Sequence, residues 1–280
     1  MLDAHTHVFP PEFCSRREDF FADEPGFRLL YDSPKSKMVG PEELVRGLDE
    51  EGMDGAVVLG FPWRREQNWR RHNEVILEAM RRWPRRLMGF CAVNPRFPGA
   101  VREVERCLAA GARGVGELAF YMTDRSEDLT ALLAPIAELC HHYQAPLLLH
   151  ATDRAGPEYP GRMLTPLAAV YKAIKAFPET IWILAHWGGR LPFYGLLKKE
   201  APEILRNVYY DTAASPFIYR PVIYRVVAEM VGPEKILFGS DYPLLGLKRY
   251  LDDMAEANLP EDWKEMILGK NLAKLMNWEG

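Results

Sequence analysis

The chain has 280 residues and a formal net charge of −4, with 48% hydrophobic and 26% charged side chains. These values are typical of a soluble globular protein and exclude a largely disordered chain. The acidic balance excludes a general nucleic-acid binder, which needs a basic surface, and no apolar run approaches the roughly 20 residues of a membrane-spanning helix.

Eight short segments, rich in Val, Ile, Leu and aromatic residues, are typical of buried strands. In chain order they are 2–8, 55–60, 87–94, 112–118, 146–152, 181–189, 208–215 and 236–243. Several are apolar throughout, as expected for strands of a parallel sheet that helices cover.

Segments with helical periodicity lie between these strands, and a last one follows them. They are 41–52, 73–83, 99–111, 127–144, 163–177, 192–206, 217–232, 246–257 and 260–278. Such alternation predicts right-handed βαβ units and a parallel sheet. Eight repeats in about 250 residues fit a closed barrel, and no dinucleotide-binding glycine motif follows the first strand. We therefore predict an α/β fold: a single (β/α)8 TIM barrel domain over residues 1–280, with an extra C-terminal helix.

Two connections are long enough to form walls of an active site. Residues 9–40 separate the first strand from the first helix, and 152–162 follow the fifth strand. Long loops that leave the carboxyl ends of barrel strands lie on the active face. We expect these loops to be a lid or a wall of the substrate pocket.

Eight arginines lie between Trp63 and Arg86, together with His72, which we expect to be exposed. Two interpretations are open: a site for an anionic substrate or partner, or a solvated helix face. The four cysteines are scattered without a CxxC spacing, and no apolar leader precedes His5. Both observations favour a cytoplasmic protein.

Six polar residues fall near the carboxyl ends of predicted strands, inside apolar or glycine-rich stretches. Alternate residues of a strand point to the same side, so His5 and His7 should project together. The other four are Glu117, His150, His186 and Asp241. Because nitrogen and carboxylate ligands together suit Zn, Mn or Fe, their convergence at one end of a barrel predicts a metal site.

Each of these residues also has a structural interpretation. His150 and His186 could be hydrogen-bonded core histidines, Asp241 could cap a turn, and Glu117 could pair with Arg113. His141 and His142 should lie at the end of a helix, where positive charge is favoured.

The HTH motif at 5–7, His150, His186 after ILA, and FGSDYP at 238–243 resemble the amidohydrolase superfamily of metal-dependent (β/α)8 enzymes. The closer resemblance is to the amidohydrolase-related branch that includes aminocarboxymuconate-semialdehyde decarboxylase and other aromatic-acid decarboxylases. The string MILGKNLAKLMN resembles the closing helix of that branch, so the resemblance spans nearly the whole chain.

This resemblance implies that His5, His7 and Asp241 bind a first metal ion and that His150 is the fifth-strand ligand. His186 would be a ligand of a second ion or a catalytic histidine. Glu117 stands where many two-metal members have a carboxylated lysine, and it resembles the bridging glutamate of other members. The implied cofactor is one or two divalent ions, Zn before Mn or Fe.

The presence of Glu117 leads us to expect a hydrolase that cleaves an amide, ester or lactone bond of a small molecule. A metal-bound water would attack, and Asp241 would move its proton while the metal or His186 polarises the substrate. The alternative is a non-oxidative decarboxylase or other lyase, and a third is a barrel that binds metal without catalysis. A homodimer is expected from the resemblance.

Three further residues are candidates for substrate binding: Arg154 and Arg190, which could bind a carboxylate, and Tyr121. Tyr121 belongs to a set of aromatic residues near strand ends that could line a pocket or simply pack under the loops. The other members of this set are Phe61, Trp63, Trp187, Phe217 and Tyr242.

Overall fold

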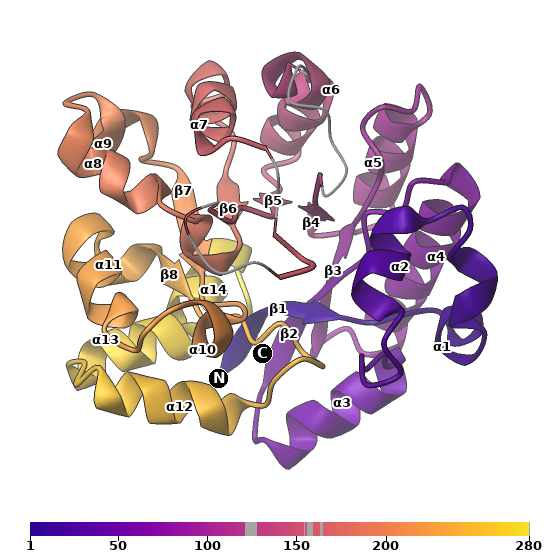
Figure 1. Ribbon diagram of the computed structural model, residues 1–280, viewed down its shortest axis with the longest axis horizontal. Coiled ribbons are helices and arrows are strands. Elements are labelled where there is room, and N and C mark those ends of the chain that lie inside the picture. Colours follow the sequence, from indigo (N-terminus) through magenta and orange to yellow (C-terminus); the bar gives the residue numbers. More distant parts are fainter. Residues whose placement is uncertain (121–127, 154, 156–158, 163–164, 280) are drawn as a thin grey trace.

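The computed structural model describes residues 1–120, 128–153, 155, 159–162 and 165–279. It contains one sheet of eight parallel strands that follow one another in chain order, surrounded by a ring of helices (Figure 1). The strands are β1 Leu2–His7, β2 Gly55–Leu59, β3 Leu87–Cys91, β4 Gly114–Leu118, β5 Leu147–Leu149, β6 Trp182–Leu184, β7 Val208–Asp211 and β8 Ile236–Leu237. The predicted (β/α)8 barrel is confirmed.

Long helices connect most of the strands, and shorter ones line the loops. The α-helices are α1 Pro11–Ser15, α2 Pro25–Tyr31, α3 Pro41–Glu50, α4 Glu66–Arg82, α5 Ala100–Ala109, α6 Leu129–His142, α7 Leu167–Ala176, α8 Tyr194–Leu197, α9 Ala201–Ile204, α10 Ser215–Ile218, α11 Ile223–Val231, α12 Leu247–Glu256, α13 Glu261–Glu265 and α14 Asn271–Met276. Among the described residues, no helix combines the length and apolar character that crossing a membrane requires.

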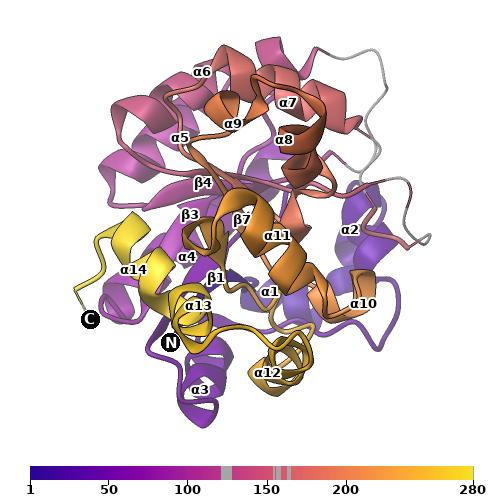
Figure 2. The ribbon, with the colours of Figure 1, turned by 90° about the vertical axis from the view of Figure 1, so that its left-hand side faces the viewer.

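The barrel closes between β1 and the segment that follows β8. Ala4 N donates to Phe238 O at 2.7 Å, and Asp241 N donates to His5 O at 2.9 Å. Figure 2 shows both chain termini with α14 at one end of the barrel, and α2 with α10 at the opposite end. Since α10 follows the carboxyl end of β7, that opposite end is the face where a barrel carries its chemistry.

Apolar side chains of the strands form a continuous interior cluster that includes Val57, Phe90, Leu148 and Ile183. Leu272 and Met276 of α14 pack against it, so the predicted C-terminal helix closes the end of the barrel opposite the chemistry. This packing leaves the carboxyl ends of the strands free for polar side chains.

Several predicted elements end earlier or are split, each for a local reason. The strand predicted over 181–189 ends at Leu184, because residues 186–189 have positive φ values from 56° to 62° that no strand can hold. The helix predicted over 217–232 is divided into α10 and α11 around Pro221, which has no N–H for a helical bond. The final helix predicted over 260–278 contains a π-helical turn, Met266–Lys270.

Residues 9–40 form a structured excursion from the barrel, which we call the β1 arm. It contains α1, a short 3₁₀ turn (Arg17–Phe20) and α2, and it lies against α4 at one side of the ring (Figure 1). Phe9 N donates to Val39 O at 2.8 Å, so the two ends of the arm meet. The predicted long loop is therefore a small helical unit that packs on the active face.

Arginines of the Arg-rich segment fasten the β1 arm. Arg65 pairs with Asp23 and Arg71 pairs with Glu12, both at 2.6 Å. Glu24 is buried in the arm, where its carboxylate accepts bonds from the backbone N–H groups of residues 64 and 65. Three more of these arginines pair with nearby acids, namely Arg70, Arg82 and Arg86. The segment therefore holds other parts of the chain in place, unlike a simple solvated face.

Candidate metal centre

His5 and His7 point into the carboxyl end of the barrel from β1. Their Nε2 atoms lie 3.1 Å apart, and both rings are buried. His5 Nδ1 donates to Asp211 Oδ2 at 2.8 Å, so His5 Nε2 is the ring nitrogen that a metal ion could bind. His7 Nδ1 is buried and has no hydrogen-bond partner among the described residues. The predicted convergence of the two β1 histidines is therefore observed.

Glu117, at the end of β4, lies between two pairs of histidines. Its Oε2 is 3.9 Å from His5 Nε2 and 3.8 Å from His7 Nε2. Its Oε1 is 2.8 Å from His150 Nδ1 and 3.7 Å from His186 Nε2. The structural alternative of a pair with Arg113 is not observed, because Arg113 bonds to the carbonyl oxygen of Met276.

His150 and His186 form the second pair, with His150 Nδ1 3.1 Å from His186 Nε2. His150 Nε2 lies 2.8 Å from the carbonyl oxygen of Gly161, and His186 Nδ1 lies 2.9 Å from that of Ala213. A carbonyl oxygen can only accept, so each of these nitrogens carries a proton. The facing nitrogens, Nδ1 of His150 and Nε2 of His186, are the ones that point toward Glu117, and His150 Nδ1 is within hydrogen-bond distance of its Oε1.

Asp241 completes the group from the segment after β8. Its Oδ1 is 3.3 Å from His7 Nε2 and 3.6 Å from His5 Nε2. Asp3 positions this segment, because its Oδ1 accepts from His5 N and Ser240 N at 2.9 and 3.0 Å. The Asp241 side chain is 19% exposed, against 4% for Glu117. The accessible edge of the site is therefore the one that Asp241 forms.

All six predicted residues converge, and together they present imidazole nitrogens and carboxylate oxygens. His5, His7 and Glu117 form one group whose ligand atoms lie within 4.8 Å of one another, and Glu117, His150 and His186 form a second. Carboxylates packed this closely need positive charge beside them, which protonated histidines or a bound metal ion can supply. Imidazole nitrogen with carboxylate oxygen suits a divalent ion such as Mn²⁺, Fe²⁺ or Zn²⁺, so the donor set fits the implied cofactor.

The pKa values of these groups also show that the carboxylates and histidines stabilise each other's charged forms. Burial raises the pKa of Glu117, but the charge and hydrogen bond of His150 outweigh it and lower the pKa to about 2. Burial lowers the pKa of His5, yet the charge and hydrogen bond of Asp211 raise it to about 10. Burial opposes ionisation of Asp241, whose pKa is nevertheless lowered by His7 and His5. The carboxylates thus stay ionised and draw positive charge into the site.

Aromatic side chains of the β1 arm form a wall beside these ligands. The ring of Tyr31 lies 4.9 Å from that of Phe27 and 5.2 Å from that of Phe9, and 5.9 Å from the ring of Phe61. Burial raises the pKa of the Tyr31 phenol, and the negative charges of Asp241 and Glu117 raise it further. The Tyr31 phenol is therefore neutral at physiological pH and senses the charge of both carboxylates. Tyr31 was not among the candidates predicted from the sequence, because it lies in a helix of a long connection, far along the chain from any strand end.

His72 is buried, so the expectation that it is exposed was wrong. Its Nδ1 accepts from Trp63 Nε1 at 2.8 Å, and its Nε2 donates to the carbonyl oxygen of Val8 at 2.5 Å. Burial lowers its pKa to about 3, which keeps the ring neutral. His72 thus ties α4 to the end of the strand that carries His5 and His7.

The remaining predicted site residues lie at the periphery or outside the described chain. Arg190 is exposed and pairs with Asp153, and both line a cavity of about 760 Å³ that also contacts Thr152. Tyr121 and Arg154 fall outside the described residues. Of the aromatic candidates, Phe61, Trp63 and Trp187 are buried, whereas Phe217 is exposed.

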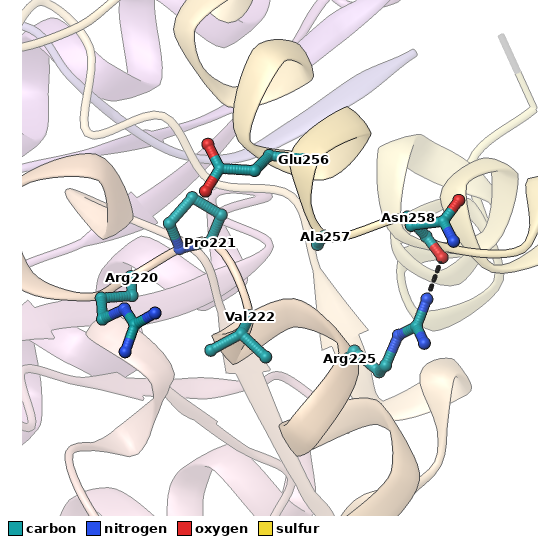
Figure 3. Close-up of a pocket in the computed structure, with 7 residues that line it drawn as sticks. All are labelled: Arg220, Pro221, Val222, Arg225, Glu256, Ala257 and Asn258. Carbon is teal, nitrogen blue, oxygen red and sulfur yellow. Dashed lines mark hydrogen bonds between the residues drawn. The ribbon is translucent and has the colours of Figure 1, made fainter.

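A second cavity, of about 300 Å³, lies away from the six convergent residues, between the start of α11 and the end of α12 (Figure 3). Arg220 and Arg225 lie on one side of it, and Glu256 lies on the other. Arg225 donates to the backbone carbonyl of Asn258. None of the predicted site residues lines this cavity, so it is separate from the metal centre.

Comparison with known proteins agrees with this geometry. A family model described as Amidohydrolase (Amidohydro_2) matches residues 2–278. Among curated proteins, 6-methylsalicylic acid decarboxylase of Penicillium expansum is 30% identical over 112 residues, which is 34% of this chain and 34% of that protein. The match thus spans about a third of the fungal protein.

Solved structures resemble nearly the whole chain. The 5-carboxyvanillate decarboxylase of Sphingomonas paucimobilis has a TM-score of 0.76 at 19% identity, covering 99% of this chain and 98% of that one. A dihydroxybenzoic acid decarboxylase from a Polaromonas species has a TM-score of 0.73 at 18% identity, covering 100% and 97%. The latter contains bound manganese and the inhibitor 2-nitroresorcinol. At identities of 18% and 19%, this structural similarity is evidence for the fold alone.

The expectation of a hydrolase was wrong. The proteins named above, whether similar in sequence or in structure, are decarboxylases. They favour the alternative expectation, a non-oxidative decarboxylase or other lyase. Our reason for preferring hydrolysis was Glu117. A glutamate between two histidine pairs favours the binding of positive charge, such as a metal ion. It does not determine which bond of the substrate breaks.

Proposed function

The chain belongs to the amidohydrolase family whose model matches residues 2–278, and from this premise we propose that it is a metal-dependent, non-oxidative decarboxylase of a hydroxylated aromatic acid. The observation that carries the proposal is the curated relative, a 6-methylsalicylic acid decarboxylase that is 30% identical over 112 residues. The aromatic side chains of the β1 arm support it, because they suit the planar ring of an aromatic acid, and the positive charge of a bound metal ion would attract its carboxylate.

We propose that the six convergent residues hold a divalent metal ion. His5, His7 and Asp241 would be its ligands on the accessible side, and Glu117 would share its carboxylate with a second group formed by His150 and His186. When bound, the metal would supply positive charge that orients the oxygen atoms of the substrate. Manganese is the first ion to test, because a similar structure contains it, and zinc, the expectation from sequence, is the second.

Asp241 is the group best suited to move the proton. Its lowered pKa makes it a carboxylate at neutral pH, and it is more exposed than Glu117. It can therefore accept the proton of a substrate hydroxyl or carboxyl group and return it to the ring carbon. The bond from that carbon to the carboxyl group breaks as the C–H bond forms, and carbon dioxide leaves. No oxidant or water is consumed.

Other residues would set selectivity. Tyr31 would contact the ring or hydroxyl of the substrate from the wall of the β1 arm. His186, whose Nε2 faces Glu117 and His150, is the second candidate for a catalytic role. Arg190 would attract an anionic substrate at the cavity that it lines with Asp153, and Arg154 and Tyr121 stay predictions as substrate contacts. The homodimer also stays a prediction.

The test is release of carbon dioxide by the purified protein, stripped of metal and reloaded with Mn²⁺ or Zn²⁺. The substrates are 2,6-dihydroxybenzoic acid, 6-methylsalicylic acid and 5-carboxyvanillic acid, with unsubstituted benzoic acid and chelator-treated protein as controls. We expect metal-dependent release of carbon dioxide and the matching phenol from at least one hydroxylated acid. Cleavage of esters or lactones, with no carbon dioxide from any acid by the metal-loaded protein, would refute the proposal.

A further inference from the structure

Asp211 lies at the end of β7, is fully buried, and was not singled out among the candidate residues. Both of its carboxylate oxygens are engaged, and they serve different strands. Oδ2 accepts from His5 Nδ1 at 2.8 Å, and Oδ1 accepts from the backbone N–H groups of His186 and Ala213, both at 3.0 Å. One side chain therefore contacts a histidine of each group in the metal centre.

The bond to His5 selects the tautomer of that ring. A carboxylate at Nδ1 holds the proton there and leaves Nε2 free to face His7 and the site. A carboxylate partner also makes the imidazole a stronger ligand, and removing such a partner weakens metal affinity by about 10–100-fold in known sites.

The hydrogen bond from the backbone N–H of His186 to Asp211 stabilises an unfavourable backbone conformation. His186 has a φ of 56° and Trp187 a φ of 62°, values in the left-handed region that side chains with a Cβ rarely adopt. Asp211 Oδ1 binds the N–H of His186, and the carbonyl oxygen of Ala213, two residues later, accepts from His186 Nδ1. The end of β7 thus fixes both the backbone and the ring of His186.

We propose that Asp211 is the positioning residue of the metal centre, which sets His5 and His186 together so that the two groups of ligands form as one unit. It would act on the metal through the two histidines that it binds, while its bond from Ala213 N fixes its own carboxylate. The inference rests on the metal centre of the proposed function and does not depend on the reaction that the centre performs.

The first test compares Asp211→Asn with Asp253→Asn, a change at another buried aspartate that pairs with Arg249 on α12. Mn²⁺ is titrated into each metal-free protein, and the free ion is counted by electron paramagnetic resonance. We expect Asp211→Asn to raise the Kd about 10–100-fold and Asp253→Asn to leave it within about twofold. An unchanged Kd in Asp211→Asn, with the fold checked by circular dichroism, would overturn the inference.

A double-mutant cycle then tests the route through His5. If Asp211 acts on this ligand, Asp211→Asn should weaken Mn²⁺ binding much less in a His5→Ala background, where only the contact with His186 is left. An equal loss in both backgrounds would mean that Asp211 supports the fold generally, and the positioning role would be rejected.

A measurement on the unaltered protein covers the case in which Asp211→Asn does not fold. ¹⁵N spectra of labelled histidines in the Zn²⁺-loaded protein report which ring nitrogen carries the proton. We expect His5 to be protonated at Nδ1, with Nε2 shifted by zinc, and a proton on Nε2 would overturn the inference. A protein that passes these tests and releases no carbon dioxide would refute the proposed function alone.

Discussion

Acidification should destabilise the protein through His72, the neutral histidine that ties α4 to the end of β1. Its pKa is about 3 in the folded protein and about 6.5 in an unfolded chain. Between these values the unfolded state binds more protons, so the free energy of unfolding falls as pH falls below 6.5. At pH 5.5 this linkage removes about 1.4 kcal/mol of stability, and at pH 7.5 it removes less than about 0.1 kcal/mol.

The assay is urea unfolding of metal-free protein at pH 7.5 and 5.5, for the unaltered chain and for His72→Gln. Glutamine keeps an amide donor and acceptor but does not titrate, so the variant should lose about 1.3 kcal/mol less between the two pH values than the unaltered chain does. The matched control is His141→Gln, at an exposed histidine that should leave the difference unchanged. Equal pH dependence in His72→Gln and the unaltered chain would refute the reasoning.

Three further changes test the site. Asp241→Asn should lower kcat for carbon dioxide release by about 10²–10⁴ even at Mn²⁺ concentrations that saturate the variant, because the amide oxygen can still bind the ion but cannot accept a proton; a retained kcat would remove Asp241 from the proton step. Glu117→Gln removes the charge shared by both histidine pairs, so Mn²⁺ titration should show a Kd raised by more than about 100-fold, and an unaltered Kd would contradict a ligand role. Tyr31→Phe should raise KM for a hydroxylated benzoic acid about fivefold with kcat retained, since one hydrogen bond of about 1 kcal/mol is lost, and an unchanged KM would remove Tyr31 from the substrate contacts.

Much of the metal centre could be predicted because two simple regularities apply to it. Alternation along a strand puts His5 and His7 on one side, and parallel strands bring their carboxyl ends to one end of the barrel. The same rule points to Asp211, the last residue of β7, but an aspartate followed by Thr and Ala also looks like an ordinary turn. Only the contact with His5, 206 residues away in the chain, distinguishes the two interpretations.

The errors have physical causes as well. His72 was predicted to be exposed because arginines surround it, yet Trp69, His72 and Ile76 recur at helical spacing on the buried face of α4. Periodicity within the helix was the better guide than local charge. The reaction could not be deduced, because metal ligands specify a charge and a geometry that hydrolases and decarboxylases share.

The two ends of the β1 arm lie side by side, and this arrangement affects how the substrate preference of the enzyme could change in evolution. Because the chain leaves and rejoins the barrel at Phe9 and Val39, the excursion can change in length at little entropic cost, about 0.6 kcal/mol for each doubling. The wall that would sort substrates is therefore carried by a segment that can be exchanged while the strands and their ligands stay as they are. New substrate preferences could thus arise by replacement of the β1 arm alone, with the metal centre unchanged.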